Sequence, residues 1–213
     1  MDELIGKIQT RARNPKTIND MAEGVSPPYQ LPPTTSMGKV AEVEKKLGFA
    51  LPELLRRFYT EIADGGFGPG YGLTGIESDR NSYLNGNLAE SYEYYLRASD
   101  TEFGAPWQPK LLPILTWGCG ILSCVDCADS AYPVYYLDPG DHCLDDPNLE
   151  VTIEHADGTV EKLDGFPGMN NPEPRRDDKP KGLQLVKQAG SFEEFMQKWA
   201  DGVNLWNEMM GEG

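Results

Sequence analysis

Basic residues and histidines are scarce in this sequence. Its 213 residues include 19 Lys and Arg and two His against 34 Asp and Glu, which gives a formal net charge of −15. A surface so rich in acid repels the phosphate backbone of nucleic acids, so we expect no direct nucleic-acid partner. The same charge attracts basic proteins and speeds their encounter. The alternative interpretation is that the acids only keep the protein soluble.

The sequence also lacks a long apolar run. A membrane-spanning helix needs about 18 consecutive apolar residues, and no stretch approaches that length. Residues 1–13 lack the apolar core, about 7–15 residues long, of a secretory signal. We therefore expect a cytoplasmic protein with no membrane partner. Apolar residues still make up 39% of the chain, which is enough to build a sizeable core.

Cysteines are few, and they lie close together in the sequence. Cys119, Cys124 and Cys127 give the spacing C-x4-C-x2-C, and Cys143 follows. In a cytoplasmic chain this cluster argues against a disulfide framework and raises the hypothesis of a zinc site. Alternation along a strand would place Cys124 and Cys127 on opposite faces, so that the thiolates would not converge. We therefore expect small buried core cysteines and no bound metal.

No signature of catalysis or cofactor binding is found. Residues 70–75 fit G-x-G-x-x-G, but no strand precedes them and no helical periodicity follows, so we interpret them as a glycine-rich turn. His142 and His155 lie downstream of the cysteines without a nucleophile signature, and we expect both at the surface. The acids of residues 138–146 do not fit the EF-hand calcium pattern. We expect no enzyme activity and no cofactor. A zinc protein or an enzyme built on the cysteine cluster is the weaker alternative.

Five segments have the apolar spacing of amphipathic helices. They are residues 2–13, 40–47 and 52–62, a helix capped by Asn87, and a last helix that begins at Ser191. Glycines stop the second and third of these helices, and Ser191 with Glu194 forms a capping box. The buried face of the fourth is expected to include Leu88, Tyr92, Tyr95 and Leu96, and that of the last Phe192, Phe195, Met196, Trp199 and Trp206.

The middle of the chain predicts strands at residues 70–76, 111–117, 120–127 and 134–137, and a hairpin over residues 151–163 around Asp157-Gly158. Helices at both ends with strands between them predict an α+β fold, a largely antiparallel central sheet with helices packed on it. Four prolines between residues 27 and 33 favour extended chain. We expect residues 1–35 to form an N-terminal helix and a Pro-rich extension, and residues 36–213 to form a single domain.

Several blocks resemble the SUKH superfamily, which is named for a fungal cell-wall-synthesis regulator and includes bacterial immunity proteins. The blocks are AEVEKKLGFALPELLRRFY with GGFG, LLPILTWGCGILSCVDC, PVYYLDP and SFEEFMQKWADG. They appear in the family's order and span roughly residues 36–206. The resemblance implies a SUKH-like α+β fold. The N-terminal extension and the segment Asp138 to Lys181 depart from the short family pattern.

The resemblance implies a cytoplasmic immunity protein that binds and neutralises a cognate toxin, such as a nuclease or a deaminase with a basic surface. Between Asp126 and Asp164 the chain holds eleven acids against one base, Lys162. Charge complementarity therefore places the partner-binding surface there, with a glycine-rich turn at its edge. The candidate residues are Asp126, Asp138, Asp141, Asp145, Asp146 and Tyr71. The alternative is an adaptor or regulator with several partners, which would dock through its Pro-rich N-terminal segment.

Overall fold

The computed structural model of the chain describes residues 1–20, 30–77, 84, 86–102, 105–137, 150–154, 160–164, 183 and 185–210. Within this part of the chain, helices lie at both ends of the sequence and strands lie between them. The central sheet is antiparallel throughout. The α+β fold class expected from the sequence is therefore confirmed.

The central sheet has four strands in the order β1-β2-β3-β6. They are β1 (Leu111–Gly118), β2 (Ile121–Asp126), β3 (Val134–Leu137) and β6 (Leu185–Ala189). The first three agree closely with the predicted strands, and the predicted hairpin is present as β4 (Glu150–Glu154) paired with β5 (Val160–Asp164). The strand β6 was not predicted, because Lys187 and Gln188 stand side by side and interrupt the alternation of apolar and polar residues.

The strand predicted at residues 70–76 is not formed, although the segment lies beside β1. The Tyr71 N–H donates to the Thr116 carbonyl at 3.1 Å, and the Thr74 N–H donates to the Ile114 carbonyl at 2.8 Å. Gly70 and Gly72 have φ of 57° and 90°, outside the extended region that a regular strand requires. The segment therefore covers the edge of β1 with two separate bonds and adds no fifth strand to the sheet.

Some of the helices begin at a capping side chain or end at a glycine. They are α1 (Asp2–Ala12), α2 (Met37–Leu47), α3 (Glu53–Arg57), α4 (Leu88–Glu102), α5 (Phe192–Ala200) and α6 (Leu205–Met210). Ser36 caps α2 by accepting from the Lys39 N–H, and Gly48, with φ of 78°, ends it. The helix α3 continues into a π-helical turn, η2 (Phe58–Ile62), in which the Ala63 N–H donates to the Phe58 carbonyl.

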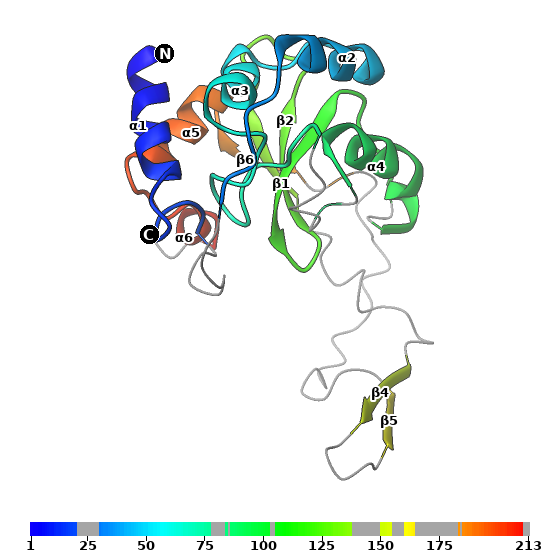
Figure 1. Ribbon diagram of the computed structural model, residues 1–213. Coiled ribbons are helices and arrows are strands. Elements are labelled where there is room, and N and C mark those ends of the chain that lie inside the picture. Colours follow the sequence, from blue (N-terminus) through cyan, green and yellow to red (C-terminus); the bar gives the residue numbers. More distant parts are fainter. Residues whose placement is uncertain are drawn as a thin grey trace.

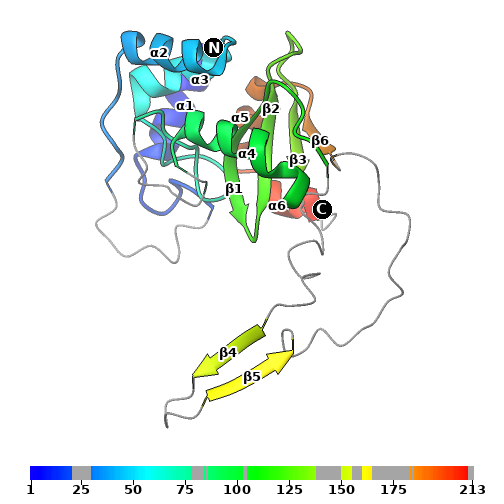
Figure 2. The ribbon, with the colours of Figure 1, turned by 90° about the vertical axis from the view of Figure 1, so that its right-hand side faces the viewer.

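The sheet lies between two groups of helices. In Figure 1 the helices α1 and α5 lie on one side of the strands and α4 on the other, and the rotated view in Figure 2 shows α4 in front of β1 and β2. Aromatic rings fill much of the core. Phe58 packs edge-on against Phe67 and Phe192, and Phe67 contacts Trp199 on α5. The core therefore joins the π-helical turn η2, the loop that contains Phe67, and α5.

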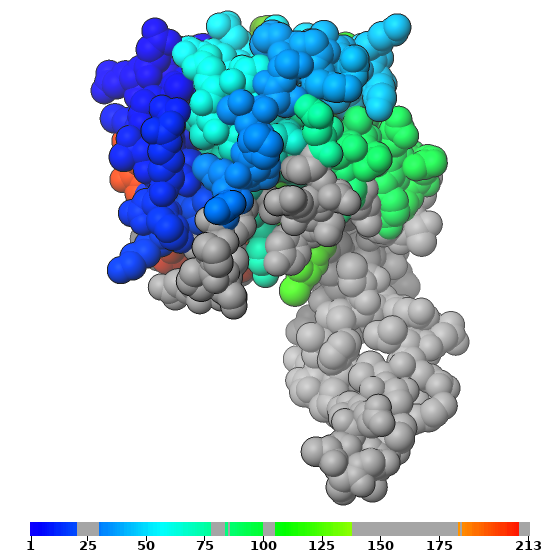
Figure 3. All heavy atoms as spheres, viewed as in Figure 1, coloured from blue at the N-terminus to red at the C-terminus, as the bar shows by residue number. Residues whose placement is uncertain are grey.

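The first helix contributes to the same core. Leu4, Ile5 and Ile8 of α1 are buried in the cluster that contains the residues of α3 and α5. Figure 3 shows the residues of α1 lying directly against those that follow α2, without a break in the surface. The Pro-rich segment ends against the same body, since the Pro33 carbonyl accepts from the Asp64 N–H at 3.1 Å. The hydrophobic core thus includes residues on both sides of position 35.

Two predicted core positions are wrong. Leu96 is 45% exposed on α4, whereas Leu88, Tyr92 and Tyr95 of the same helix are buried. Trp206 does not lie on the last long helix, because that helix ends at Ala200 and Gly202 follows with φ of 86°. Trp206 belongs to α6 and packs half-buried against Trp117, with ring centroids 5.7 Å apart. Half of the predicted capping box of α5 is present, since Ser191 accepts from the Glu194 N–H at 3.0 Å. The Glu194 side chain accepts from the Gly190 N–H, one residue before the N-cap, and not from the Ser191 N–H.

Candidate partner-binding surface

The acidic segment begins at the end of β2, where two aspartates shape a turn. Asp126 is the last residue of β2 and pairs with Leu111 of β1. Its Oδ1 accepts from the Ala128 N–H at 2.8 Å, and Asp129 Oδ1 accepts in the same way from the Ala131 N–H at 2.9 Å. These are Asx turns, which hold the chain between β2 and β3 in a fixed shape. Asp129 is exposed and Asp126 half-buried, so both carboxylates lie at the surface.

Asp129 was not among the named candidates, although it lies within the acidic segment. The spacing that identifies it is D-x-A, which occurs twice between Asp126 and Ala131. An Asp whose carboxylate accepts a backbone N–H two residues later is held in position before any partner arrives. Asp126 and Asp129 are therefore the acids of this segment whose orientation is set by described contacts.

Tyr71 lies at the opposite end of the β1–β2 hairpin. A side chain on Gly118, which precedes the turn between these strands, would come within 3.3 Å of Tyr71 Cε2. Gly118 has φ of 97°, and the turn brings its backbone against the tyrosine ring. Asp126 is separated from this turn by the length of β2, which is about 17 Å for five steps of 3.3 Å. The structure therefore does not bring Tyr71 and Asp126 together.

The other four candidates, Asp138, Asp141, Asp145 and Asp146, lie outside the described residues. The same is true of Cys143, His142 and His155. The hairpin β4–β5 follows this part of the sequence and carries further acids. Its backbone register places Glu150 opposite Asp164 and Ile153 opposite Glu161.

The three described cysteines do not converge. Cys119 is exposed in the turn between β1 and β2, Cys124 is buried within β2, and Cys127 follows the far end of that strand. The Cys127 N–H donates to the Lys110 carbonyl, at the end of the hairpin opposite to Cys119. In the described ranges, no group of three His, Cys, Asp or Glu could hold a metal ion.

Burial makes the thiols of Cys124 and Cys127 poor nucleophiles. Desolvation raises the pKa of the Cys124 thiol far above its ordinary value. Desolvation and the neighbouring carboxylate of Asp126 raise the pKa of Cys127 to about 12. A reactive cysteine needs the opposite shift, toward the thiolate at neutral pH. The chemistry of this pair of cysteines is therefore that of core side chains.

Comparison with protein-family models identifies the family of this chain. The SMI1 / KNR4 family (SUKH-1) matches residues 35–159, more than half of the chain. The chain belongs to this family, and the resemblance stated from the sequence is confirmed. No curated protein and no solved structure matches. Membership is consistent with an immunity-type or regulatory protein that acts by binding another protein.

Several structural elements lie outside the matched residues. They are α1, β5, β6, α5 and α6. The helices α1 and α5 pack on each other, and Lys7 of α1 forms an ion pair of 3.2 Å with Asp201 at the end of α5. No helix among the described residues is long and apolar enough to cross a membrane.

Proposed function

We propose that this protein binds and neutralises a basic protein toxin by stoichiometric association, through the acidic segment Asp126–Asp164. The observation that carries the proposal is the charge of this segment, eleven acids and one base, in a chain that belongs to the SMI1 / KNR4 family. Nucleases and deaminases that bind nucleic acids have basic surfaces, because they must neutralise phosphates. An inhibitor of the opposite charge associates rapidly with such a surface and binds it in preference to neutral proteins.

The described part of the segment supports this role. Asp126 and Asp129 are positioned by their own turns, and the second oxygen of each carboxylate makes no hydrogen bond to a described residue. A guanidinium group of a partner would bind such an oxygen with a strong, charge-assisted hydrogen bond. Because the two turns already fix the carboxylates, little side-chain freedom is lost on binding. Neutralisation of this kind requires no bond to be made or broken by the inhibitor.

The experiment is capture of the partner followed by titration of its activity. The tagged full-length protein is incubated with a lysate of its native host, and captured proteins are ranked by isoelectric point and by elution with salt. We expect a basic partner that elutes at moderate salt and whose activity falls linearly to zero at equal molar amounts. Inhibition that is complete at a small fraction of one equivalent would indicate catalysis and overturn the proposal. A set of several unrelated partners, none inhibited, would instead support a regulator.

A deletion of residues 1–35 would not distinguish an inhibitor of a toxin from a regulator that docks through its N-terminal segment. The deletion removes Leu4, Ile5 and Ile8 from the core, so that loss of binding would follow from unfolding alone. Substitutions in the exposed acids leave the core intact and are the better test.

A further inference from the structure

The outer edge of the central sheet, at β6, is open within the part of the chain that the structure describes. The strand β6 comes last in the strand order and pairs with β3 alone among the described strands. Figure 2 shows β6 beside β3, on the side of the sheet away from β1. The other edge differs, because the Tyr71 and Thr74 N–H groups donate to β1 and cover it. The unpaired backbone N–H and C=O groups of an open edge are satisfied best by another strand.

The hydrogen bonds of the neighbouring ladder show which way the backbone of β3 faces. The Asp126 N–H donates to the Pro133 carbonyl at 3.0 Å, so these residues form a hydrogen-bonded pair between β2 and the start of β3. Hydrogen-bonded and non-hydrogen-bonded pairs alternate along an antiparallel ladder. Counting from Pro133, Tyr135 bonds to β2, and Tyr136 directs its N–H and C=O toward Val186 of β6.

The neighbours of Val186 therefore present the free edge. Leu185 and Lys187 direct their backbone groups away from β3, because the direction of these groups alternates along a strand. The Leu185 N–H agrees with this, since it donates to the Leu183 carbonyl at 3.1 Å and not to β3. The Lys187 N–H and the carbonyls of Leu185 and Lys187 are left without a backbone partner among the described residues.

The side chains at this edge suit contact with a second copy of the same strand. Val186 is 58% exposed, although it is apolar and β-branched, and Tyr136 lies opposite it on the same face of the sheet. The sequence holds no acid between Asp178 and Glu193, in a chain of net charge −15. Two copies can therefore pair along β6 without placing acidic side chains opposite each other.

We propose that β6 pairs antiparallel with β6 of a second copy about a two-fold axis at Val186, so that the two central sheets become continuous. In this register the two copies of Val186 form a non-hydrogen-bonded pair, the position at which side chains approach most closely. Lys187 of each copy lies opposite Leu185 of the other, and the free backbone groups of both residues bond across the axis. The dimer goes beyond the proposed function, because β6 lies outside the acidic segment.

A lysine on an edge strand is also a device against edge-to-edge pairing. Here it disfavours the register centred on Lys187, which places two like charges opposite each other, and it is compatible with the register centred on Val186. The valine becomes buried only when the edge is paired. Because the strand is short, we expect a weak dimer, with a dissociation constant on the order of 100 µM. The net charges of the two copies repel each other, so salt should strengthen the association.

The test is sedimentation velocity of the full-length protein between about 5 µM and about 1 mM, a range that brackets the expected dissociation constant. We expect monomer at low concentration, dimer at high concentration, and tighter association in about 0.5 M than in about 0.05 M sodium chloride. The toxin complex should instead weaken with salt, so that failure of one proposal is distinguishable from failure of the other. Protein that stays monomeric throughout would overturn the dimer and indicate a protected edge.

Two pairs of substitutions locate the contact. Val186→Lys places two charges opposite each other and should weaken the dimer at least ten-fold, whereas Leu96→Lys, at an exposed apolar residue of α4, should not. Lys187→Pro removes the outward N–H without removing a bond to β3 and should weaken the dimer several-fold, whereas Lys187→Ala keeps the N–H and should not. Urea denaturation checks that each variant is folded. Association unchanged by Val186→Lys would overturn the proposal.

A disulfide bond tests the register directly. In a Cys119→Ser, Cys143→Ser background, Val186→Cys should give a covalent dimer on mild oxidation, because the Cα atoms of a non-hydrogen-bonded pair lie about 4.5 Å apart, within the range of a disulfide. Lys187→Cys should not, since the two copies of this position are about 8 Å apart in the same register. Equal cross-linking at the two positions would contradict the two-fold axis at Val186 and overturn the proposal.

Discussion

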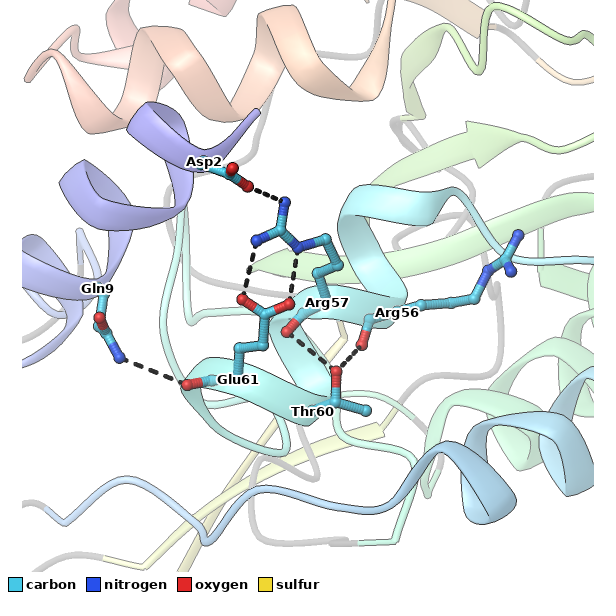
Figure 4. A network of polar contacts seen from close by, with 6 residues as sticks. All are labelled: Asp2, Gln9, Arg56, Arg57, Thr60 and Glu61. Atoms are coloured by element: carbon cyan, nitrogen blue, oxygen red, sulfur yellow. Dashed lines mark hydrogen bonds and ion pairs between the residues drawn. The ribbon is translucent and has the colours of Figure 1, made fainter.

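The carboxylate of Asp2, in the first turn of α1, accepts a hydrogen bond of 2.7 Å from Nη1 of Arg57, the last residue of α3. Figure 4 shows Arg57 between Asp2 and Glu61, which binds the guanidinium group through both of its oxygens. These hydrogen bonds raise the pKa of Arg57 and lower that of Asp2 and of Glu61. The pairs lie at the surface and contribute little to stability. The Asp2–Arg57 pair joins the first turn of α1 to the end of α3.

The first prediction concerns the packing of α1. Ile8 is fully buried in the core, so Ile8→Ala should lower the free energy of unfolding by about 2–4 kcal/mol. Gly6 lies exposed on the same helix with no atom within 4 Å of the position of an added Cβ. Gly6→Ala should therefore raise the free energy of unfolding, by about 0.5–1 kcal/mol. Urea denaturation measures both. An Ile8→Ala variant as stable as the native chain would show that α1 does not belong to the folded core.

The second prediction concerns a buried hydroxyl group. Tyr59 is 1% exposed, and its hydroxyl donates to the Thr74 carbonyl at 2.7 Å. Tyr59→Phe should lower the free energy of unfolding by about 1–2 kcal/mol at neutral pH, since the Thr74 carbonyl loses its buried donor. Tyr132 is a half-buried residue whose hydroxyl makes no hydrogen bond to a described residue, so Tyr132→Phe is the matched control and should be nearly neutral.

The same tyrosine predicts a dependence on pH. Burial raises the pKa of Tyr59 well above its ordinary value, because the phenolate is poorly solvated in the core. The stabilisation by the neutral hydroxyl is therefore complete below about pH 10, the pKa in the unfolded chain, and is lost as the pH rises above it. The advantage of the native chain over Tyr59→Phe should shrink between pH 9 and pH 11. An advantage that stays constant over this range would contradict the burial of the hydroxyl.

The third prediction ranks the cysteines. In a Cys143→Ser background, Cys119 should react with a thiol reagent first, because it is exposed. Cys124 should react at a rate limited by opening of the fold, since burial both shields the thiol and raises its pKa. Mass spectrometry of the alkylated peptides over time separates the sites. Rapid labelling of Cys124 in the folded protein would revive the hypothesis of a nucleophile at this position.

The fourth prediction concerns the start of α5. Ser191 Oγ accepts from the Glu194 N–H, and Glu194 Oε2 accepts from the Gly190 N–H at 2.8 Å. Ser191→Ala removes the first of these bonds and should cost about 1 kcal/mol in the free energy of unfolding. Ser191→Asp keeps an acceptor at the N-cap and should restore most of the loss. Equal destabilisation by both changes would indicate that packing of the serine, and not its cap, is what matters.

The sequence predicted those features that depend on neighbouring residues. The cap at Ser191, the glycine stop at Gly48 and the strands β1 to β3 follow from local spacing and are confirmed. The strand β6 was missed because its place beside β3 is fixed by tertiary pairing, which overrides a weak local pattern. The strand predicted at residues 70–76 is wrong because Gly70 and Gly72 adopt positive φ, which lies outside the extended region and which the sequence pattern does not reveal.

The same distinction between local sequence and tertiary packing applies to the candidate sites. The acidic segment is a property of composition, so the sequence alone identified it. The open edge at β6 depends on the strand order of the sheet, and no spacing rule predicts which strand lies outermost. Only the pairing of β6 with β3 places Val186 at that edge.

The most direct test of the central claim is the dissociation constant of the complex for two charge-reversed variants. One carries Lys at Asp138, Asp141, Asp145 and Asp146, and the other carries Lys at four exposed glutamates elsewhere, Glu3, Glu53, Glu93 and Glu193. Both change the net charge equally. Isothermal titration calorimetry should show at least ten-fold weaker binding, about 1.4 kcal/mol, for the first variant and a much smaller loss for the second. Equal affinities for the two variants would contradict the claim that the acidic segment holds the partner.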